Sequence, residues 1–234
     1  NYSKPIELIK YLISRLNLQQ DYVIDFFSGS ATTAHAVMQL NAEDGGHRKF
    51  IMVQLPEQTD VKSDAYKAGY KTICDIGEER IRRAGKKIKE ESPLTTANLD
   101  IGFRVFKVDS TNMEDVYYRP ADYNQGQMEL FADNIKPDRT PEDLLFQVML
   151  DLGILLSSDI QEAEIAGKKV FSVADGYLIA CFDKDVTEET VKAIAQKQPV
   201  YAVFRDSSMA SDSVATNFEQ IFETYSPRTQ RKVL

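Results

Sequence analysis

The sequence has few of the features that mark secreted, membrane or metal-binding proteins. Its 234 residues include two cysteines, Cys74 and Cys181, and neither belongs to a Cys-x-x-Cys pair. This spacing argues against a disulfide framework and against a structural zinc site. No apolar run approaches the roughly 20 residues that cross a bilayer, and no signal-peptide pattern opens the chain. The sequence therefore predicts a cytoplasmic protein with no membrane partner and no bound metal.

The sequence also lacks the motifs of several enzyme classes. No Gly-x-x-x-x-Gly-Lys-Ser/Thr is present, which argues against a P-loop ATPase. His35 and His47 have no cysteine or acid cluster beside them, so they are predicted to be ordinary core or surface histidines. Ser207 and Ser208 have no nearby histidine base, which argues against a nucleophilic serine.

The residues that are present predict two folded parts of different charge. Hydrophobic residues make up 43% of the chain, enough for a real core. Residues 1–98 hold 14 Lys and Arg against 13 Asp and Glu, whereas residues 99–234 hold 14 against 23. We therefore expect a domain boundary near residue 98. The acidic second half is poorly suited to nucleic-acid phosphate and fits a protein-binding or solvated surface.

Strand and helix patterns alternate through the first half. Ser3 is the expected N-cap of a helix that begins at Pro5 and ends near Asn17. The remaining expected elements are a strand at 22–27, a helix at 34–40, a strand at 49–55 and a long helix at 71–91. Such an order predicts a parallel α/β sheet with crossover helices.

The second half predicts another α/β layer. Residues 110–140 are polar and contain several Pro, Gly, Asn and Asp, so we expect a long irregular arm there. Thr140 and Pro141 open a helix, and Asp175-Gly176 forms the turn of a hairpin. The expected elements are a strand at 101–108, a helix from 141, a hairpin at 168–182, a helix at 187–196, a strand at 200–204 and a helix at 214–224.

The most informative stretch is residues 23–37, where a strand feeds a turn of small residues that opens a helix. Gly29 allows the backbone to approach a ligand closely, and the free N–H groups of the following helix face that ligand. The spacing Gly-x-Ala-x-x-Ala from Gly29 is similar to the dinucleotide fingerprint with two glycines replaced. By spacing alone, an ordinary strand-to-helix turn is equally compatible.

Asp25-Phe-Phe-Ser-Gly-Ser-Ala-Thr-Thr33 resembles the cofactor loop Asp-x-Phe-x-Gly-Ser-Gly-Thr of amino-methylating DNA methyltransferases, with Ala31 in place of glycine. Ser3-Lys4-Pro5 resembles the Lys-Pro segment before this loop in the permuted members. Residues 48–57 and 75–81 are similar to their second strand and next helix. Residues 102–107, 142–145 and 204–207 resemble the modification subunits of type III restriction–modification systems.

This resemblance covers nearly the whole chain and implies an α/β fold. Residues 1–98 would be part of a Rossmann-like, S-adenosylmethionine-dependent methyltransferase domain, and residues 99–234 a smaller α/β C-terminal domain. The ribose partner is left open between Gln54 and Glu57. The cofactor-binding residues that the resemblance implies are Lys4, Pro5, Asp25, Phe27, Gly29, Ser30, Ala31, Thr32 and Gln54.

Amino-group methylation in this family uses an Asp/Asn-Pro-Pro-aromatic segment that holds the flipped base. None of the eight prolines is adjacent to another, so we assign no catalytic residue. The chain begins at Asn1 without an initiator Met and resembles the C-terminal portion of a longer enzyme. By itself it is expected to be inactive.

The resemblance implies part of a site-specific DNA adenine-N6 methyltransferase, with DNA bound through the missing N-terminal part. The implied protein partners are a second methyltransferase subunit and the restriction subunit. The arm at 110–140 carries aromatic residues suited to such an interface, namely Tyr117, Tyr118, Tyr123 and Phe131. Two alternatives remain: a non-catalytic module that scaffolds such subunits, and a nicotinamide-dependent Rossmann enzyme.

One basic run has two interpretations. It comprises Arg80, Arg82, Arg83, Lys86, Lys87 and Lys89, and pairs of glutamates flank it. Its spacing favours a solvated helix face with i,i+4 ion pairs. Contact with DNA phosphate is the less common alternative.

Overall fold

The computed structural model describes residues 4–114, 134–205, 209 and 211–234. The chain divides after Val105 into two compact units, Asn1–Val105 and Phe106–Leu234. The division lies seven residues after the expected boundary. Within the described residues, no helix combines the length and apolar character needed to cross a bilayer.

The first unit alternates strands and helices, as the sequence predicted. β1 and β2 pair in parallel, with Val23 opposite Phe50, and they form a two-stranded sheet among the described residues. The elements are α1 (Ile6–Ser14), β1 (Tyr22–Asp25), α2 (Thr32–Asp44), β2 (Lys49–Met52), α3 (Asp64–Lys67) and α4 (Ile73–Glu91).

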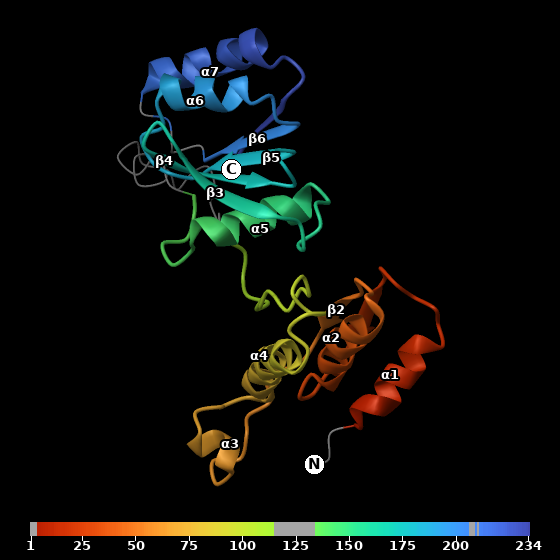
Figure 1. Cartoon of the computed structure of the whole chain (residues 1–234). Coiled ribbons are helices and arrows are strands. Elements are labelled where there is room, and N and C mark those ends of the chain that lie inside the picture. The colour runs from red at the N-terminus through yellow and green to blue at the C-terminus, as the bar shows by residue number, and fades with distance from the viewer. Residues whose placement is uncertain (1–3, 115–133, 206–208, 210) are drawn as a thin grey trace. The chain divides into compact units, whose positions relative to one another are not determined.

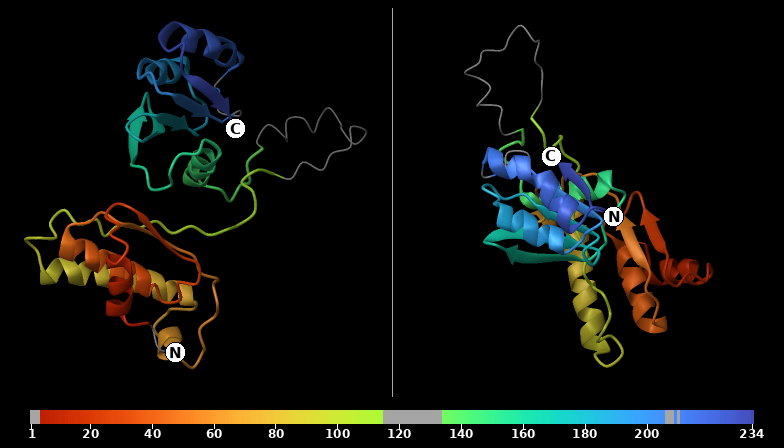
Figure 2. Two further views of the ribbon diagram at one scale, coloured as in Figure 1. Left: turned by 90° about the vertical axis from the view of Figure 1, so that its right-hand side faces the viewer. Right: turned by 90° about the horizontal axis from the view of Figure 1, so that it is seen from above.

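Helix α2 forms the centre of the first unit and packs between α1 and α4 (Figures 1 and 2). Ala34 and Ala36 are fully buried and short, so α4 approaches closely and packs Ile81 and Ala84 against Ala34 and Met38. The start of α4 is set by a capping box between Thr72 and Asp75. Helix α2 is therefore packed on two sides, and Ala31 of the loop before it belongs to the same core cluster.

Within the described residues of the first unit, helices cover one face of its sheet. Val23, Phe50 and Met52 pack against the helices. The alternate residues Tyr22, Ile24, Ile51 and Val53 point the other way and are exposed. Parallel strands in folded proteins are normally buried on both faces, so this apolar face is unusual.

The second unit is a five-stranded mixed sheet in the order β3-β4-β5-β6-β7 (Figure 1). β3, β4 and β5 are antiparallel, and β6 and β7 continue in parallel. One face packs against α5 and the other against α6 and α7. The elements are α5 (Pro141–Asp151), β3 (Ile160–Ile165), β4 (Lys168–Val173), β5 (Leu178–Cys181), α6 (Glu188–Gln196), β6 (Tyr201–Phe204), α7 (Asp212–Tyr225) and β7 (Gln230–Val233).

Several expectations are corrected by the structure. Residues 101–108 form no strand, because Ile101 and Phe103 pack individually onto the core beside α4 and no strand pairs with them. Helix α1 is preceded by Pro5 as an extended N-cap without a side-chain bond, and the helix ends at Ser14 rather than near Asn17. Ser3, Ser207, Ser208 and residues 115–133 of the arm, with its four aromatic residues, lie outside the described residues.

Candidate functional site

The loop between β1 and α2 adopts a tight, left-handed conformation. Gly29 has φ of 52° and Ala31 has φ of 58°, and the Ala31 N–H donates to the Ser28 carbonyl over 2.9 Å. A side chain at Ala31 costs about 1–2 kcal/mol in this conformation, which explains the glycine of the resembling loops. Gly77 on α4 faces this turn, and a Cβ there would lie 3.4 Å from the Gly29 carbonyl oxygen. Glycine at 77 thus lets α4 support the loop.

Asp25 ties the end of β1 to the first turn of α2. One carboxylate oxygen accepts from the Phe27 N–H over 3.2 Å, and the other accepts from the Thr33 hydroxyl over 2.6 Å. Both bonds involve a charged acceptor, so each is stronger than a neutral hydrogen bond. Asp25 therefore braces the loop from within.

Gln54 connects the two loops that follow the parallel strands. Its Oε1 accepts from the Gly29 N–H over 2.8 Å, while its Nε2 donates to the Leu55 carbonyl over 3.1 Å. Glu57 lies beyond Pro56 and is exposed. The amide at 54 is thus engaged in holding the loop, whereas the carboxylate at 57 faces solvent.

The structure gathers most of the predicted cofactor residues on this pair of loops. Asp25, Phe27, Ser30, Thr32 and Gln54 lie on or beside the β1–α2 turn with Gly29 and Ala31. The Phe27 ring projects outward and is 81% exposed. Lys4 and Pro5 precede α1, and no hydrogen bond or ion pair within the described residues joins them to the turn.

Arg80 is a residue of this region that the motif did not single out. From α4, its Nη1 donates to the Ser30 hydroxyl over 3.0 Å and to the Thr32 hydroxyl over 2.8 Å. Burial lowers the pKa of Arg80. The basic run in the sequence indicated that cations lie on this helix. Its spacing did not indicate which of them contacts the loop.

Four other members of the basic run form the ion pairs that the i,i+4 pattern predicted. Arg82 pairs with Glu78 over 2.9 Å and Arg83 with Glu79 over 2.6 Å. The second pair of glutamates extends the pattern: Lys86 lies 3.8 Å from Glu90 and Lys87 lies 3.6 Å from Glu91. The predicted i,i+4 ion pairs are therefore confirmed for these four residues.

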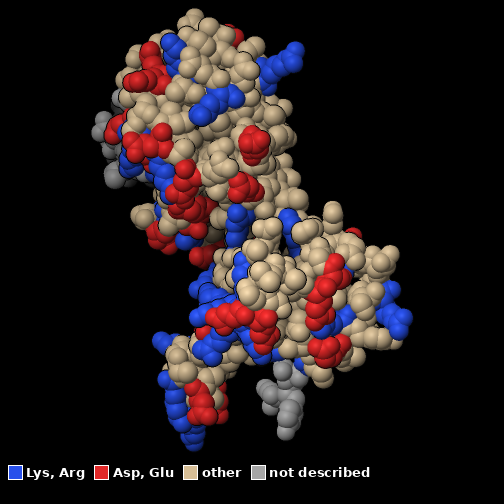
Figure 3. All heavy atoms as spheres, viewed as in Figure 1, with Lys and Arg blue, Asp and Glu red and all other residues tan. Residues whose placement is uncertain are grey.

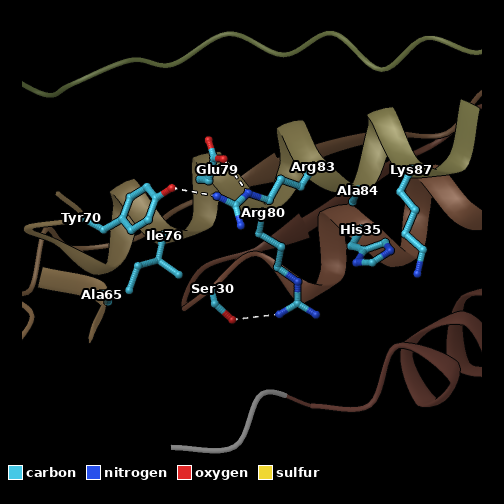
Figure 4. Close-up of a pocket in the computed structure, with 10 residues that line it drawn as sticks. All are labelled: Ser30, His35, Ala65, Tyr70, Ile76, Glu79, Arg80, Arg83, Ala84 and Lys87. Atoms are coloured by element: carbon cyan, nitrogen blue, oxygen red, sulfur yellow. Dashed lines mark hydrogen bonds and ion pairs between the residues drawn. The ribbon is translucent and has the colours of Figure 1, made fainter. Parts of the chain in front are cut away.

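A cavity of about 550 Å³ lies beside Arg80, between α2 and α4 (Figure 4). His35 lies in it half-buried, and its Nδ1 is buried without a hydrogen-bond partner among the described residues. Burial, followed by the charges of Arg80 and Lys87, lowers the pKa of His35. In the described part of the chain no group of three or more His, Cys, Asp or Glu could hold a metal. The cavity is lined by Ser30, His35, Ala65, Tyr70, Ile76, Glu79, Arg80, Arg83, Ala84 and Lys87.

Residues 1–86 match the DNA methylase family N6_N4_Mtase. The Mod subunit of the type III restriction–modification enzyme EcoP15I of Escherichia coli is 36% identical over 225 residues, which are 93% of this chain and 31% of that protein. The EcoPI Mod subunit of Escherichia phage P1 is 32% identical over 196 residues, 83% of this chain and 29% of the relative. The StyLTI Mod subunit of Salmonella typhimurium is 45% identical over 104 residues, 44% of this chain and 16% of the relative.

The first two relatives are similar to this chain across both of its units, beyond the region that the methylase family matches. The chain spans less than a third of the length of each relative. The motif around Gly29 and the similarity of the second unit lead to the same family. The chain therefore belongs to the modification-subunit family of type III restriction–modification methyltransferases.

Proposed function

We propose that the loops after β1 and β2 form the S-adenosylmethionine-binding half of a DNA adenine-N6 methyltransferase. The observation that carries this proposal is the left-handed turn at Gly29, braced by Asp25 and Gln54 at the carboxyl ends of two parallel strands. Ligands of open α/β sheets bind at this end of the strands. When bound, S-adenosylmethionine supplies an electrophilic sulfonium methyl group.

The residues of the turn have distinct roles in this proposal. A Cβ at Gly29 would meet no atom within 4 Å, so the space beyond the turn is open to a ligand. No side chain caps the start of α2, which leaves its first N–H groups available to the methionine end of the cofactor. The exposed ring of Phe27 offers a surface for adenosine, and Glu57 is the better placed of the two candidate ribose partners.

Lys4 and Pro5 are proposed to complete the cleft from the segment before α1. The assignment of these two residues rests on the resemblance of the Lys-Pro segment alone.

The uncovered face of the sheet supports the view that this domain is part of a larger one. Tyr22, Ile24, Ile51 and Val53 expose an apolar face, and two strands alone are marginally stable. The Mod relatives are more than three times longer than the region they share with this chain. We propose that further sequence of the enzyme covers this face and supplies the Pro-Pro-aromatic segment, the contact with the target base and the DNA specificity.

The second unit is proposed to bind protein partners rather than DNA. Residues 99–234 carry nine more acidic than basic residues, so the field around them repels phosphate. The partners would be a second methyltransferase subunit or the restriction subunit. Pull-down from the full restriction system, with and without residues 112–138, tests whether the arm is needed.

Calorimetry with S-adenosylhomocysteine tests the cofactor site. Gly29→Val should abolish binding, because a branched side chain would enter the open space and strain a left-handed backbone. Gly45→Val is the matched control, since Gly45 has φ of 72° and open space at the far end of α2. Equal affinity of the wild type and Gly29→Val, or equal loss in both variants, would contradict the assignment of the loop.

A further inference from the structure

The cavity between α2 and α4 has a strongly basic wall that cofactor binding does not explain. Arg80, Arg83 and Lys87 line it together with His35, and Glu79 is its one acidic residue. Figure 3 shows Lys and Arg side chains gathered over α4, with Glu side chains among them. The remaining wall is largely apolar, and Tyr70 closes one end. The cavity thus combines positive charge with surface suited to a sugar or base.

Arg80 differs from its neighbours because it has no carboxylate partner among the described residues. Its Nη1 is used on the hydroxyl oxygens of Ser30 and Thr32, which leaves Nε and Nη2 without partners in the same part of the chain. A half-buried guanidinium normally pairs with an anion, because burial removes solvation that only an opposite charge replaces. Arg80 therefore has unused capacity to bind an oxyanion.

His35 lies next to Arg80 in the cavity (Figure 4). Its buried Nδ1 lacks a hydrogen-bond partner among the described residues, and a buried polar atom without a partner is unfavourable. The charges of Arg80 and Lys87 help to lower the pKa of His35, as expected where the local field is positive. An oxyanion in the cavity would pair with Arg80 and offset the positive field around His35, although the buried Nδ1 of His35 itself lies out of its reach.

The three basic side chains form one stripe of α4. Positions 80, 83 and 87 are spaced i, i+3 and i+7, which places them on the same helix face over about 10 Å. One strand of B-DNA presents a phosphate about every 3.4 Å along its axis, so a stripe of this length can face about three phosphates. The stripe therefore matches a polyanion better than a single carboxylate.

We propose that this cavity binds the phosphate backbone of a DNA strand, with Arg80 at one phosphate and Arg83 and Lys87 contacting its neighbours. The proposal rests on the proposed function only in taking DNA as the substrate. S-Adenosylmethionine is a poor candidate for the cavity, because its sulfonium and ammonium outnumber its carboxylate and the wall would repel it. A DNA strand carries charge of the required sign at every nucleotide.

The test uses exposed residues, because changing Arg80 would also disturb Ser30 and Thr32 on the cofactor loop. Arg83→Gln/Lys87→Gln removes two cavity cations whose side chains are 72% and 69% exposed. Arg82→Gln/Lys86→Gln is the matched control on the same helix, with side chains 54% and 77% exposed and equivalent glutamate partners. The control pair does not line the cavity. Both double variants change the net charge equally.

Fluorescence anisotropy of a labelled DNA duplex, titrated with the full chain at several salt concentrations, measures the effect. For Arg83→Gln/Lys87→Gln, the slope of log affinity against log salt should become shallower by about 1.8, with about tenfold weaker binding. The control should stay within about twofold of wild type. Equal loss in both double variants, or no binding of DNA by the wild type, would overturn the proposal.

Calorimetry with S-adenosylhomocysteine on the same proteins separates this proposal from the cofactor assignment. Unchanged S-adenosylhomocysteine affinity in Arg83→Gln/Lys87→Gln, together with weaker DNA binding, supports the DNA site. Weaker S-adenosylhomocysteine binding with unchanged DNA binding would assign the cavity to the cofactor and overturn the proposal. In a further outcome, the wild type binds no S-adenosylhomocysteine, yet binds DNA more tightly than Arg83→Gln/Lys87→Gln does while the control variant matches the wild type. That result refutes the cofactor function and supports the DNA site.

Discussion

Replacing Gln54 with leucine tests whether this side chain holds the cofactor loop or contacts the cofactor itself. The Oε1 of Gln54 accepts from the Gly29 N–H over 2.8 Å, and leucine removes that acceptor at nearly the same volume. Gln54→Glu keeps an acceptor for the same N–H. The pair of variants therefore separates loss of the hydrogen bond from a general disturbance of the loop.

The expected magnitude follows from the burial of this bond. A neutral hydrogen bond contributes about 0.5–1.5 kcal/mol, and a fully buried donor left alone costs about 1–3 kcal/mol. Gln54 is half-buried, so in the leucine variant a water molecule can partly replace the lost acceptor of the Gly29 N–H. We therefore expect the ordered loop to be destabilised by about 1 kcal/mol. If the cofactor binds only the ordered loop, Gln54→Leu should weaken S-adenosylhomocysteine binding about fivefold. Gln54→Glu should stay within about twofold of wild type.

Calorimetry with two ligands distinguishes positioning from ribose contact. A positioning role predicts that Gln54→Leu weakens binding of S-adenosylhomocysteine and of its 2′,3′-dideoxy analogue by the same factor. Glu57→Gln should weaken only the ligand that carries the ribose hydroxyls, because Glu57 is exposed and free to accept from them. The positioning role is refuted if Gln54→Leu binds both ligands with wild-type affinity. It is also refuted if Gln54→Leu weakens binding of S-adenosylhomocysteine but not of the dideoxy analogue.

Two further predictions concern stability and activity. The side chain of Arg48 is 2% exposed and donates to both carboxylate oxygens of Asp44. Asp44→Ala should therefore lower the free energy of unfolding by about 2 kcal/mol and the melting temperature by about 10 °C. The control Glu90→Ala removes an exposed ion pair and should lower the free energy of unfolding by less than about 0.5 kcal/mol. Hydrogen bonding from Arg48 lowers the pKa of Asp44 below 3.8. The stabilisation by this pair is therefore complete above pH 3.8 and is lost as the pH falls through the folded-state pKa. The melting temperatures of the wild type and Asp44→Ala should converge in acid. The purified chain should transfer no radiolabelled methyl group to adenine-containing duplex, because it has no Pro-Pro-aromatic segment to hold the amine; incorporation above a no-enzyme blank would contradict this.

Local chemistry made many elements predictable. Thr140 with Pro141 and Thr187 begin α5 and α6 as their capping residues predict, and Asp175-Gly176 forms the expected turn between β4 and β5. The strands that escaped prediction are the edge strands. β3 and β7 are largely polar and mostly exposed, so they carry no hydrophobic pattern, and the pairing partner alone makes them strands.

The sequence by itself determined the tight turn at residues 25–33. These residues combine small side chains and a glycine between a strand and a helix, and that short-range order is sufficient to predict a tight strand-to-helix turn. It also determined the i,i+4 pairing along α4, because partners one helical turn apart must meet. Both results depend on residues close together in the chain.

Tertiary structure alone decided which distant side chains reach that loop. Arg80 lies about fifty positions from Ser30, and Gln54 lies twenty-five from Gly29, yet both contact the turn because α4 and β2 pack beside it. The strand expected at 101–108 did not form for the same reason: Ile101 and Phe103 pack beside α4, and no strand among the described residues pairs with this stretch. A local sequence pattern leaves several tertiary contacts equally possible. The folded structure decides between them, because the apolar area that a residue buries depends on all the elements packed around it.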